Sequence, residues 1–335
     1  MPVQGFEATV TPEEQARWET TKEFREQLAA LQKPVLARWL WAVGKDWLGI
    51  AAVMAAAIAI DHVVAYIVAI LLIGPLIHAL GILGHDGMHR LACRNRKLNN
   101  ALTQFFTFWP VHADINVYRA FHMGHHRHVN TPDDPELAYR SKGAPEWDLP
   151  RSRPSFLARY LKDLFGFGFT ELYRVLLFVS GRSLSAWLGS ILWAGIWVSI
   201  ALLTGHLSIL VMWYGAFFTS FVLCWRFRCW LEHIDADGTH RVHLTWWQGM
   251  LFAPHKVWYH YEHHKWASIP FYNLPAARKL DTSVSVISLA ELYQFYAQAP
   301  PSQSGMLSAR QQARWEQSRA PARANGNAKA LLEEA

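Results

Sequence analysis

Residues 183–225 read SLSAWLGSILWAGIWVSIALLTGHLSILVMWYGAFFTSFVLCW, and none of these 43 residues is Asp, Glu, Lys or Arg. One helix that crosses a bilayer needs about 20 apolar residues. The segment is therefore long enough for two membrane-spanning helices. Thr204-Gly205-His206 lies near its middle and predicts the turn of a helical hairpin.

An earlier apolar segment, residues 40–83, predicts a second hairpin that turns at Asp61-His62. Lys45 and Asp46 interrupt its first arm, and we expect both at the membrane interface with the lysine reaching outward. Composition agrees, because 52% of the chain is hydrophobic and only 17% is charged. The sequence therefore predicts an all-α integral membrane protein with four transmembrane helices in two hairpins, plus helices at the membrane surface.

The positions of Lys and Arg predict the orientation of this protein. Neither turn contains either residue, whereas the opposite ends of the helices carry Lys22, Arg25, Lys33, Arg38, Arg90, Arg94, Arg96, Lys97, Arg182, Arg226 and Arg228. Loops rich in Lys and Arg stay in the cytoplasm. We therefore expect a bacterial inner-membrane protein with both termini in the cytoplasm. The net charge of +6 suits an anionic membrane face and acidic partners, and no motif indicates nucleic-acid binding.

Three parts of the chain are expected to differ in organisation. Residues 1–38 form a cytoplasmic N-terminal segment in which Thr11-Pro12-Glu13-Glu14 is a capping box that opens an amphipathic helix to about Gln32. Residues 39–299 form the membrane domain, with a short helical or re-entrant stretch at 98–111 and a surface helix at 155–179, broken near Gly166. Residues 300–335 are expected to be a disordered tail.

Three short histidine clusters follow the predicted membrane helices or lie in the loop between the hairpins. They read His85-Asp86-Gly87-Met88-His89, His122-Met123-Gly124-His125-His126 and His260-Tyr261-Glu262-His263-His264. Two complete hairpins place all three clusters on one side of the membrane, so they can converge as a cytoplasmic cap.

These spacings favour metal binding, because residues three or four apart share one face of a helix. Eight imidazoles are too many for one ion but suit two. Imidazole binds iron, copper or zinc, so ligand type alone leaves the metal open. No Cys pair suggests zinc or an iron–sulfur cluster, and no Glu-x-x-His pair suggests the carboxylate-rich di-iron site of four-helix bundles.

The order of the clusters and the two hairpins resemble the membrane-bound fatty acid desaturase superfamily, over roughly residues 40–295. Flanking residues agree, namely Tyr118-Arg119, Asp133-Asp134-Pro135 and the run Pro270-Phe271-Tyr272-Asn273-Leu274-Pro275. The resemblance implies two non-haem irons that activate O2. It implies eight ligands, which are His85, His89, His122, His125, His126, His260, His263 and His264.

The resemblance also implies a further ligand after the fourth helix, where Leu231-Glu232-His233 stands. His233 is therefore the ninth candidate, and a histidine bonded to a carbonyl or lipid headgroup is the alternative. Asp86, Asp134 and Glu262 are expected to fix imidazole tautomers through the second ring nitrogen. His78 lies two helical turns before His85, where it is either a helix histidine with its own partner or part of a channel wall.

These features favour an O2-dependent fatty acid desaturase that inserts a double bond into an acyl chain of a membrane lipid. In the family, an H-x3-H first box is more typical of acyl-lipid enzymes. No His-Pro-Gly-Gly motif of a fused cytochrome domain is present. Electrons should therefore come from an external ferredoxin-like or cytochrome partner, and Arg90, Arg94, Arg96 and Lys97 are a candidate docking patch.

Two kinds of alternative remain open. The same site could run a hydroxylase or ketolase reaction on a carotenoid, sterol or alkane, and His-Asp-Gly-Met-His is similar to the first box of carotenoid ketolases. A non-enzymatic metal or dihaem electron carrier is a different class, but a haem pair needs facing histidines deep in two spans. A zinc protease would need the base glutamate of HExxH, which this cluster lacks.

Overall fold

The computed structural model describes residues 7–131, 133–136, 138, 152–181, 183–233, 236 and 238–298. The described part is almost entirely helical and contains four helical segments that are long and apolar enough to span a membrane. These are α3 (Leu36–Ile60), α4 (Val63–Met88), α10 (Leu184–Thr204) and the pair α11 (Ser208–Phe218) and α12 (Ser220–Glu232). The predicted all-α membrane fold is confirmed, while the predicted tail at 300–335 lies outside the described residues.

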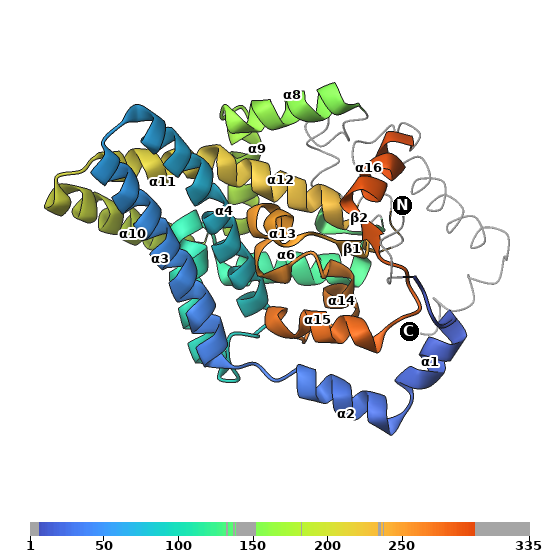
Figure 1. The fold of residues 1–335 in the computed structure, drawn as a ribbon. Helices are drawn as coiled ribbons and strands as arrows, with labels where there is room; N and C mark the ends of the chain where they lie inside the picture. Colours follow the sequence, from blue (N-terminus) through green and yellow to red (C-terminus); the bar gives the residue numbers. More distant parts are fainter. Residues whose placement is uncertain are drawn as a thin grey trace, which may run out of the picture.

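Both hairpin turns fall at the predicted positions. Helix α3 ends where Asp61 takes a left-handed conformation with φ 45°, and the His62 side chain accepts a hydrogen bond from the Val64 backbone to start α4. Helix α10 ends at Gly205, whose φ of 74° suits a residue without a Cβ. The two turns lie at one end of the molecule, toward the left in Figure 1, and the histidine-bearing helices lie toward the other end.

Helix α4 is the central helix and packs against α3, α11 and α12. Its residues Ile73, Ile77 and Leu80 are fully buried. Gly74 lets α12 approach so closely that a Cβ there would overlap Ser220. The Ser220 hydroxyl donates to the Ile70 carbonyl at 2.6 Å. The close approach fixes the end of α12, and hence His233, relative to the first histidine cluster.

A tryptophan cluster joins the two hairpins to the loop between them. The Trp47 ring stacks between Trp193 and Trp213, with ring centroids 4.9 and 5.6 Å away. The indole nitrogens of Trp47 and Trp193 donate to backbone carbonyls of the π-helical turn Gln104–Phe108. This turn follows α5 (Arg96–Thr103) and precedes a 3₁₀ turn at Trp109–Val111, so the predicted short helical stretch is confirmed.

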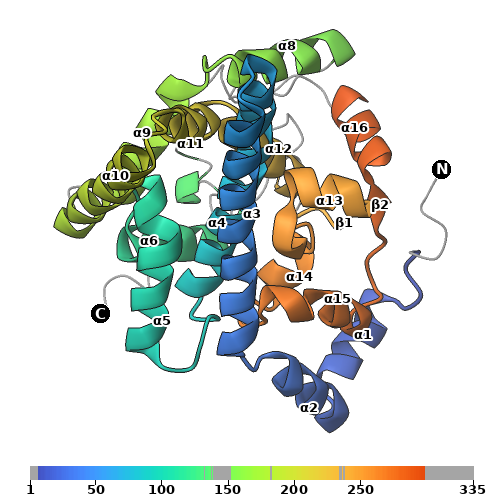
Figure 2. The ribbon, with the colours of Figure 1, turned by 60° about the vertical axis from the view of Figure 1, so that its left-hand side comes forward.

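The surface helices differ from expectation at the N-terminus. Instead of one helix to Gln32 there are two, α1 (Pro12–Glu19) and α2 (Lys22–Leu31). The Thr11 capping box forms, but the Thr21 hydroxyl also accepts from the Phe24 backbone and starts a new helix. Phe24 packs against Trp266, with ring centroids 6.0 Å apart. Figure 2 shows α1 and α2 beside α15 (Leu274–Ala277).

The long loop forms two helices, and the predicted break near Gly166 is confirmed. Its parts are α8 (Arg153–Leu164) and α9 (Phe169–Ser180), which separate at Gly166 with φ 83°. The buried Asp163 carboxylate pairs with the Arg226 guanidinium and ties α8 to α12.

Asp46 and Lys45 of α3, which are expected at the membrane interface, differ in exposure. The Asp46 side chain is buried and contacts the His255 ring at 2.5 Å, whereas the neighbouring Lys45 side chain is 60% exposed. A buried carboxylate needs a partner. Because Asp46 and His255 are 209 residues apart, the sequence alone does not indicate that they pair.

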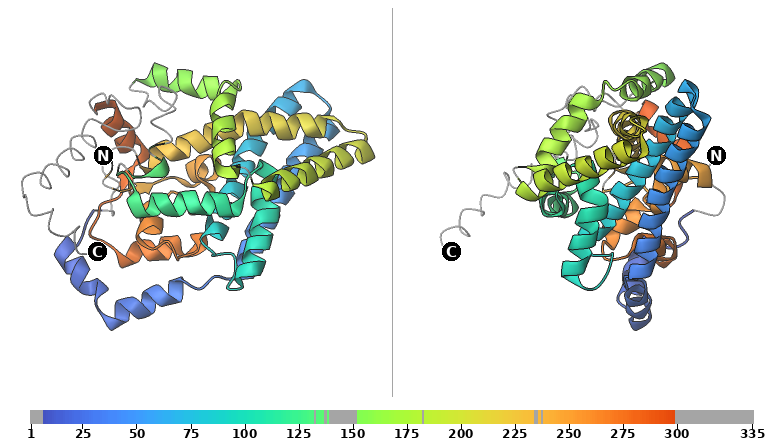
Figure 3. Two further views of the ribbon diagram at one scale, coloured as in Figure 1. Left: turned by 180° about the vertical axis from the view of Figure 1, so that it is seen from behind. Right: turned by 90° about the vertical axis from the view of Figure 1, so that its left-hand side faces the viewer.

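The remaining elements form the cap at the histidine-bearing end, which Figure 3 shows from behind and from the side. They are α6 (Ile115–His128), α13 (Trp246–Phe252), α14 (His260–Lys265), α16 (Leu289–Gln298), and 3₁₀ turns at Pro254–Lys256, Phe271–Asn273 and Arg278–Leu280. Strands β1 (Val242–His243) and β2 (Ile287–Ser288) pair in parallel, with Val242 opposite Ile287.

Candidate metal centre

Four elements deliver the nine candidate histidines to one place. His85 and His89 lie at the C-terminal end of α4, and the second cluster lies on α6, whose first turn is capped by the Asp114 carboxylate. The third cluster occupies α14, and His233 ends α12. The predicted convergence of the three clusters is thus confirmed as geometry.

The nine imidazoles divide into two groups. In each group, one nitrogen from every ring lies within 4.8 Å of the others. The first group is His85, His89, His122, His126 and His263, and the second is His125, His233, His260 and His264. The structure therefore brings together every predicted ligand, His233 included, in a pattern suited to two ions.

The helical repeat explains how the second and third clusters each contribute to both groups. His122 and His126 are four residues apart on α6 and enter the first group together, whereas His260 and His264 are four apart on α14 and enter the second. The histidine between each pair turns to the opposite group, because it lies roughly 60° or more around the helix from both. The H-x2-H-H spacing thus bridges two sites.

The hydrogen bonds of the second group show which ring nitrogens are available to a metal. His125 donates from Nδ1 to Asp134, and His233 donates from Nδ1 to the Gly238 carbonyl at 3.0 Å. A neutral imidazole has only one N–H, so both Nε2 atoms present lone pairs. These two Nε2 atoms lie 3.1 Å apart. Facing lone pairs at this distance repel unless a cation lies between them, so the donor set fits a metal ion.

The first group has the same character. Nε2 of His122 lies 2.8 Å from Nε2 of His85 and 3.0 Å from Nε2 of His126. Nε2 of His89 is buried without a hydrogen-bond partner in the described part of the chain. Burial first, and then the neighbouring imidazoles, lower the pKa of His122 and His263 well below the usual value. These rings are therefore neutral, which is the form that binds metals.

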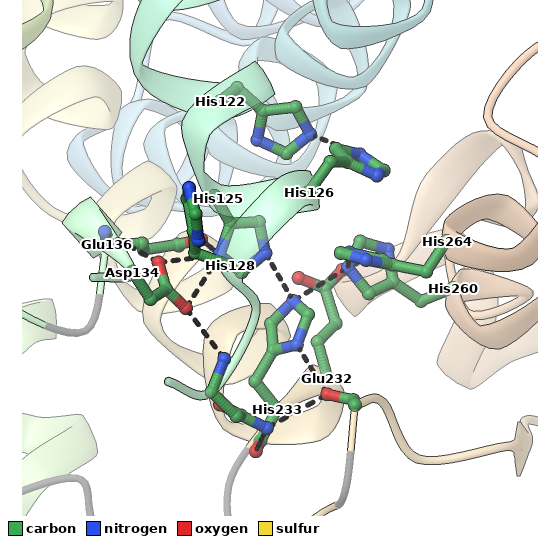
Figure 4. Close-up of polar contacts among 12 residues, drawn as sticks. His122, His125, His126, His128, Asp134, Glu136, Glu232, His233, His260 and His264 are labelled. Carbon is green, nitrogen blue, oxygen red and sulfur yellow. Dashed lines mark hydrogen bonds and ion pairs between the residues drawn. The ribbon is translucent and has the colours of Figure 1, made fainter. Parts of the chain in front are cut away.

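Carboxylates lie beside the rings of the second group, as Figure 4 shows for Asp134, Glu136 and Glu232. Both Asp134 oxygens lie 3.0 Å from His125 Nδ1, and a Glu136 oxygen lies 3.2 Å from it. The Asn130 amide donates to the carbonyls of His233 and Gly238, and its backbone donates to Asp134. The expectation that Asp134 fixes an imidazole therefore agrees with the structure.

Asp86 and Glu262 have different contacts from those expected. Asp86 accepts a hydrogen bond from the Phe271 backbone and makes none to an imidazole among the described residues. Glu262 is fully buried between the Arg241 and Arg278 guanidiniums, at 2.7 and 2.9 Å. A buried carboxylate pairs with a cation within reach. Glu262 therefore holds two arginine side chains and Asp86 holds the Phe271 backbone, rather than ring tautomers.

Several residues at the site were not predicted. Glu232 lies 3.5 Å from His260 Nδ1, and the Tyr118 ring stacks on His122 with an interplanar angle of 11°. Arg119 donates to the Met88 carbonyl and so joins α6 to the end of α4. Glu232 directly precedes His233, and Tyr118-Arg119 precedes the second cluster, so their positions in the sequence were the available signal.

Two of the cavities that the described residues form near these helices bear on the site. The larger, about 370 Å³, is formed by α8, α12, α13 and α16, and no candidate ligand lines it. The smaller, about 120 Å³, is lined by Gly84, Tyr118 and His78, so it reaches residues beside His85 and His122. His78 therefore belongs to a cavity wall, whereas His128 joins neither imidazole group.

Comparisons with known proteins agree with this geometry. The model of the fatty acid desaturase family matches residues 61–285. The dihydrorhizobitoxine desaturase of Bradyrhizobium elkanii is 28% identical over 336 aligned positions, which cover 92% of this chain and 94% of that protein. The beta-carotene ketolase of Paracoccus sp. (strain N81106 / MBIC 01143) is 26% identical over 217 positions, which cover 61% of this chain and 76% of that protein.

The family match covers most of the chain and includes all nine clustered histidines. Membership of this family implies a non-haem di-iron centre, which agrees with the two converging groups of imidazoles. The chain therefore belongs to the fatty acid desaturase family and is a membrane oxidoreductase.

Proposed function

We propose that this protein is an O2-dependent desaturase that inserts a double bond into an aliphatic chain at a histidine-ligated di-iron centre. The observation that carries the proposal is the pair of converging imidazole groups beside a cavity that starts at Gly84 and Tyr118. When bound, two irons would supply the activation of O2 needed to remove hydrogen from an unactivated C–H bond.

The nine histidines would hold the irons, five in the first group and four in the second. Asp134 would keep His125 with its proton on Nδ1, and the Gly238 carbonyl would do the same for His233. With the proton held on Nδ1, the Nε2 lone pair of each ring would remain directed at the metal. Tyr118 would shield His122 from water by stacking on it.

The reaction needs electrons from a donor. Desaturation takes two hydrogen atoms from the substrate, and two further electrons with two protons complete the reduction of one O2 to two waters. We propose a ferredoxin-like or cytochrome donor that binds the basic patch Arg90, Arg94, Arg96 and Lys97. All four side chains are exposed. Arg90 directly follows the candidate ligand His89, so a donor bound there would lie next to the metal centre.

A fatty acyl chain of a membrane lipid is the substrate class that the family suggests. The matching desaturase is named for dihydrorhizobitoxine and the matching ketolase for beta-carotene. The second candidate function is therefore a hydroxylase or ketolase reaction on another aliphatic or terpenoid molecule. The similarity to the ketolase, over 61% of this chain, supports this second candidate function.

Mass spectrometry of lipids and small metabolites from a host that expresses the protein tests these functions. The proposal predicts products two mass units lighter than a host compound. These products should be absent from cells that express His125→Ala. Products sixteen or fourteen units heavier would favour hydroxylation or ketone formation. No new product from iron-loaded protein supplied with a working donor would contradict both functions.

A further inference from the structure

Among the described residues, His78 has no hydrogen-bond partner although it is buried. Its side chain is 2% exposed, and neither ring nitrogen has a hydrogen-bond partner in the described structure. A buried imidazole without hydrogen bonds costs about 1–3 kcal/mol for each polar group left unsatisfied. A partner outside the described residues would remove this cost.

The position of His78 indicates what that partner is. The residue lines the 120 Å³ cavity together with Phe221, Phe217 and Leu172, which supply apolar walls. Its ring lies against Phe221, with centroids 6.4 Å apart. The same cavity reaches Tyr118, which stacks on the candidate ligand His122. A molecule in this cavity would thus contact His78 and lie close to the metal centre.

We propose that His78 binds a polar oxygen of the substrate, and that the segment of the substrate that enters the cavity is short. This inference rests on the proposed function. The polar atoms of the wall favour an acceptor oxygen, such as a hydroxyl, ether or carboxylate. The imidazole offers one N–H, the Arg228 guanidinium offers more, and the Thr107 hydroxyl already donates to the Thr103 carbonyl.

The geometry of α4 indicates how far this oxygen lies from the metal centre. His78 and His85 are seven residues apart on one helix face, which corresponds to about 10 Å along the axis. His85 would hold a metal and is not itself a reacting group, so this separation gives only the scale of the distance between the bound oxygen and the metal centre. A hydrogen bond occupies about 3 Å of it, which leaves room for a short segment of the substrate.

The cavity volume supports a compact segment. One buried water needs about 10–15 Å³ of cavity volume. A cavity of about 120 Å³ therefore accommodates on the order of ten non-hydrogen atoms. A plain methyl-ended chain would also fit this volume. However, it would leave His78 unsatisfied, so the cavity should discriminate against it.

Binding of two matched probes tests the inference without requiring turnover. Iron-loaded protein in lipid nanodiscs is equilibrated with labelled 1-octanol or labelled octane, and empty nanodiscs correct for partition into lipid. The wild type should bind 1-octanol about threefold to tenfold more tightly than octane, as expected for one net hydrogen bond. Equal corrected affinities in the wild type would overturn the inference.

Variants assign any preference to His78. His78→Leu should abolish the preference, whereas His78→Gln, which retains a hydrogen-bond donor, should keep most of it. Phe221→Leu changes the apolar wall of the same cavity and should alter both affinities alike. A preference that survives in folded, iron-loaded His78→Leu would overturn the assignment.

The binding and product assays separate the two proposals. A His78-dependent preference without any oxidised product would retain the binding site and reject the proposed function. Turnover without the preference for 1-octanol would support the proposed function and reject His78 as the binding site.

Discussion

Asp134 is the acid with the most direct effect on a candidate ligand. Both of its oxygens lie 3.0 Å from His125 Nδ1, and it also accepts from the backbones of Asn130 and Glu136. Loss of such a carboxylate costs about 10–100-fold in metal affinity. We expect Asp134→Asn to lose iron from the second group during dialysis against a chelator. Metal analysis per chain measures this, and the exposed neighbour Asp133→Asn is the control. Equal retention in both variants would reject this role.

His233 tests the ninth ligand in the same way. Its Nε2 lies 3.1 Å from that of His125 and 2.9 Å from that of His260. We expect His233→Ala to reduce the iron content toward one per chain and to abolish turnover. His128→Ala should retain both irons, because His128 joins neither group. If the two variants keep the same iron content, His233 is not a ligand.

At this scale the sequence predicted the histidines but not all of their supporting residues. Spacing is local information, so the three clusters could be recognised directly. The partner of an acid is not local. Glu262 lies inside the third cluster and yet pairs with Arg241 and Arg278, which only the folded chain brings together. The same holds for Asp46 and His255, which are 209 residues apart.

Among the elements, α14 depends most on its surroundings. It has six residues, and an isolated helix of that length is not stable in water. Glu262 anchors it to Arg241 and Arg278, and Arg241 also donates to the carbonyls of Arg278 and Asp281. This buried network holds the third histidine cluster in place.

We therefore expect Glu262→Gln to destabilise the iron-free protein by about 3–5 kcal/mol, because two buried guanidiniums lose their counter-charge. Denaturant unfolding in detergent measures this loss. Glu26→Gln removes an exposed ion pair with Lys22 and should cost no more than about 1 kcal/mol. Similar costs for the two variants would show that Glu262 does not anchor α14.

Elements with a strong periodic or apolar pattern were predictable, and short ones were not. The four spans and the broken surface helix follow from hydropathy and glycine placement. The break between α1 and α2 depends on whether Thr21 caps a helix, and the π-helical turn depends on indole contacts from two hairpins. Tertiary contacts therefore decide where these short elements begin and end.

For the whole molecule, the proposed electron donor is the partner whose docking site charge reversal can probe. The basic patch at Arg90, Arg94, Arg96 and Lys97 is exposed and follows the first histidine cluster. We expect Arg94→Glu/Arg96→Glu to raise the KM for reduced ferredoxin about tenfold or more at low salt, with less effect at high salt. Turnover with a small chemical reductant should not change.

The matched control for this charge reversal is Lys22→Glu/Arg25→Glu on α2, which changes the net charge equally. It should leave the KM for the donor near the wild-type value. An equal rise in both double variants would indicate a general effect of net charge and would remove the docking proposal.

The architecture of the whole molecule could be predicted from two apolar hairpins whose turns contain no Lys or Arg. Two such hairpins place every histidine cluster at the same end of the molecule. The substrate did not follow, because cavity walls are assembled from residues as distant as Gly84, Leu172 and Arg228. His78 was visible in the sequence, but its lack of a partner appears only in the fold.

The measurement that tests the central claim most directly is metal analysis combined with iron X-ray absorption on anaerobically purified wild-type protein. The account predicts two irons per chain, each with nitrogen ligands from several imidazoles. One metal per chain, or iron bound mainly through oxygen or sulfur from the protein, would contradict a di-iron centre held by these nine histidines.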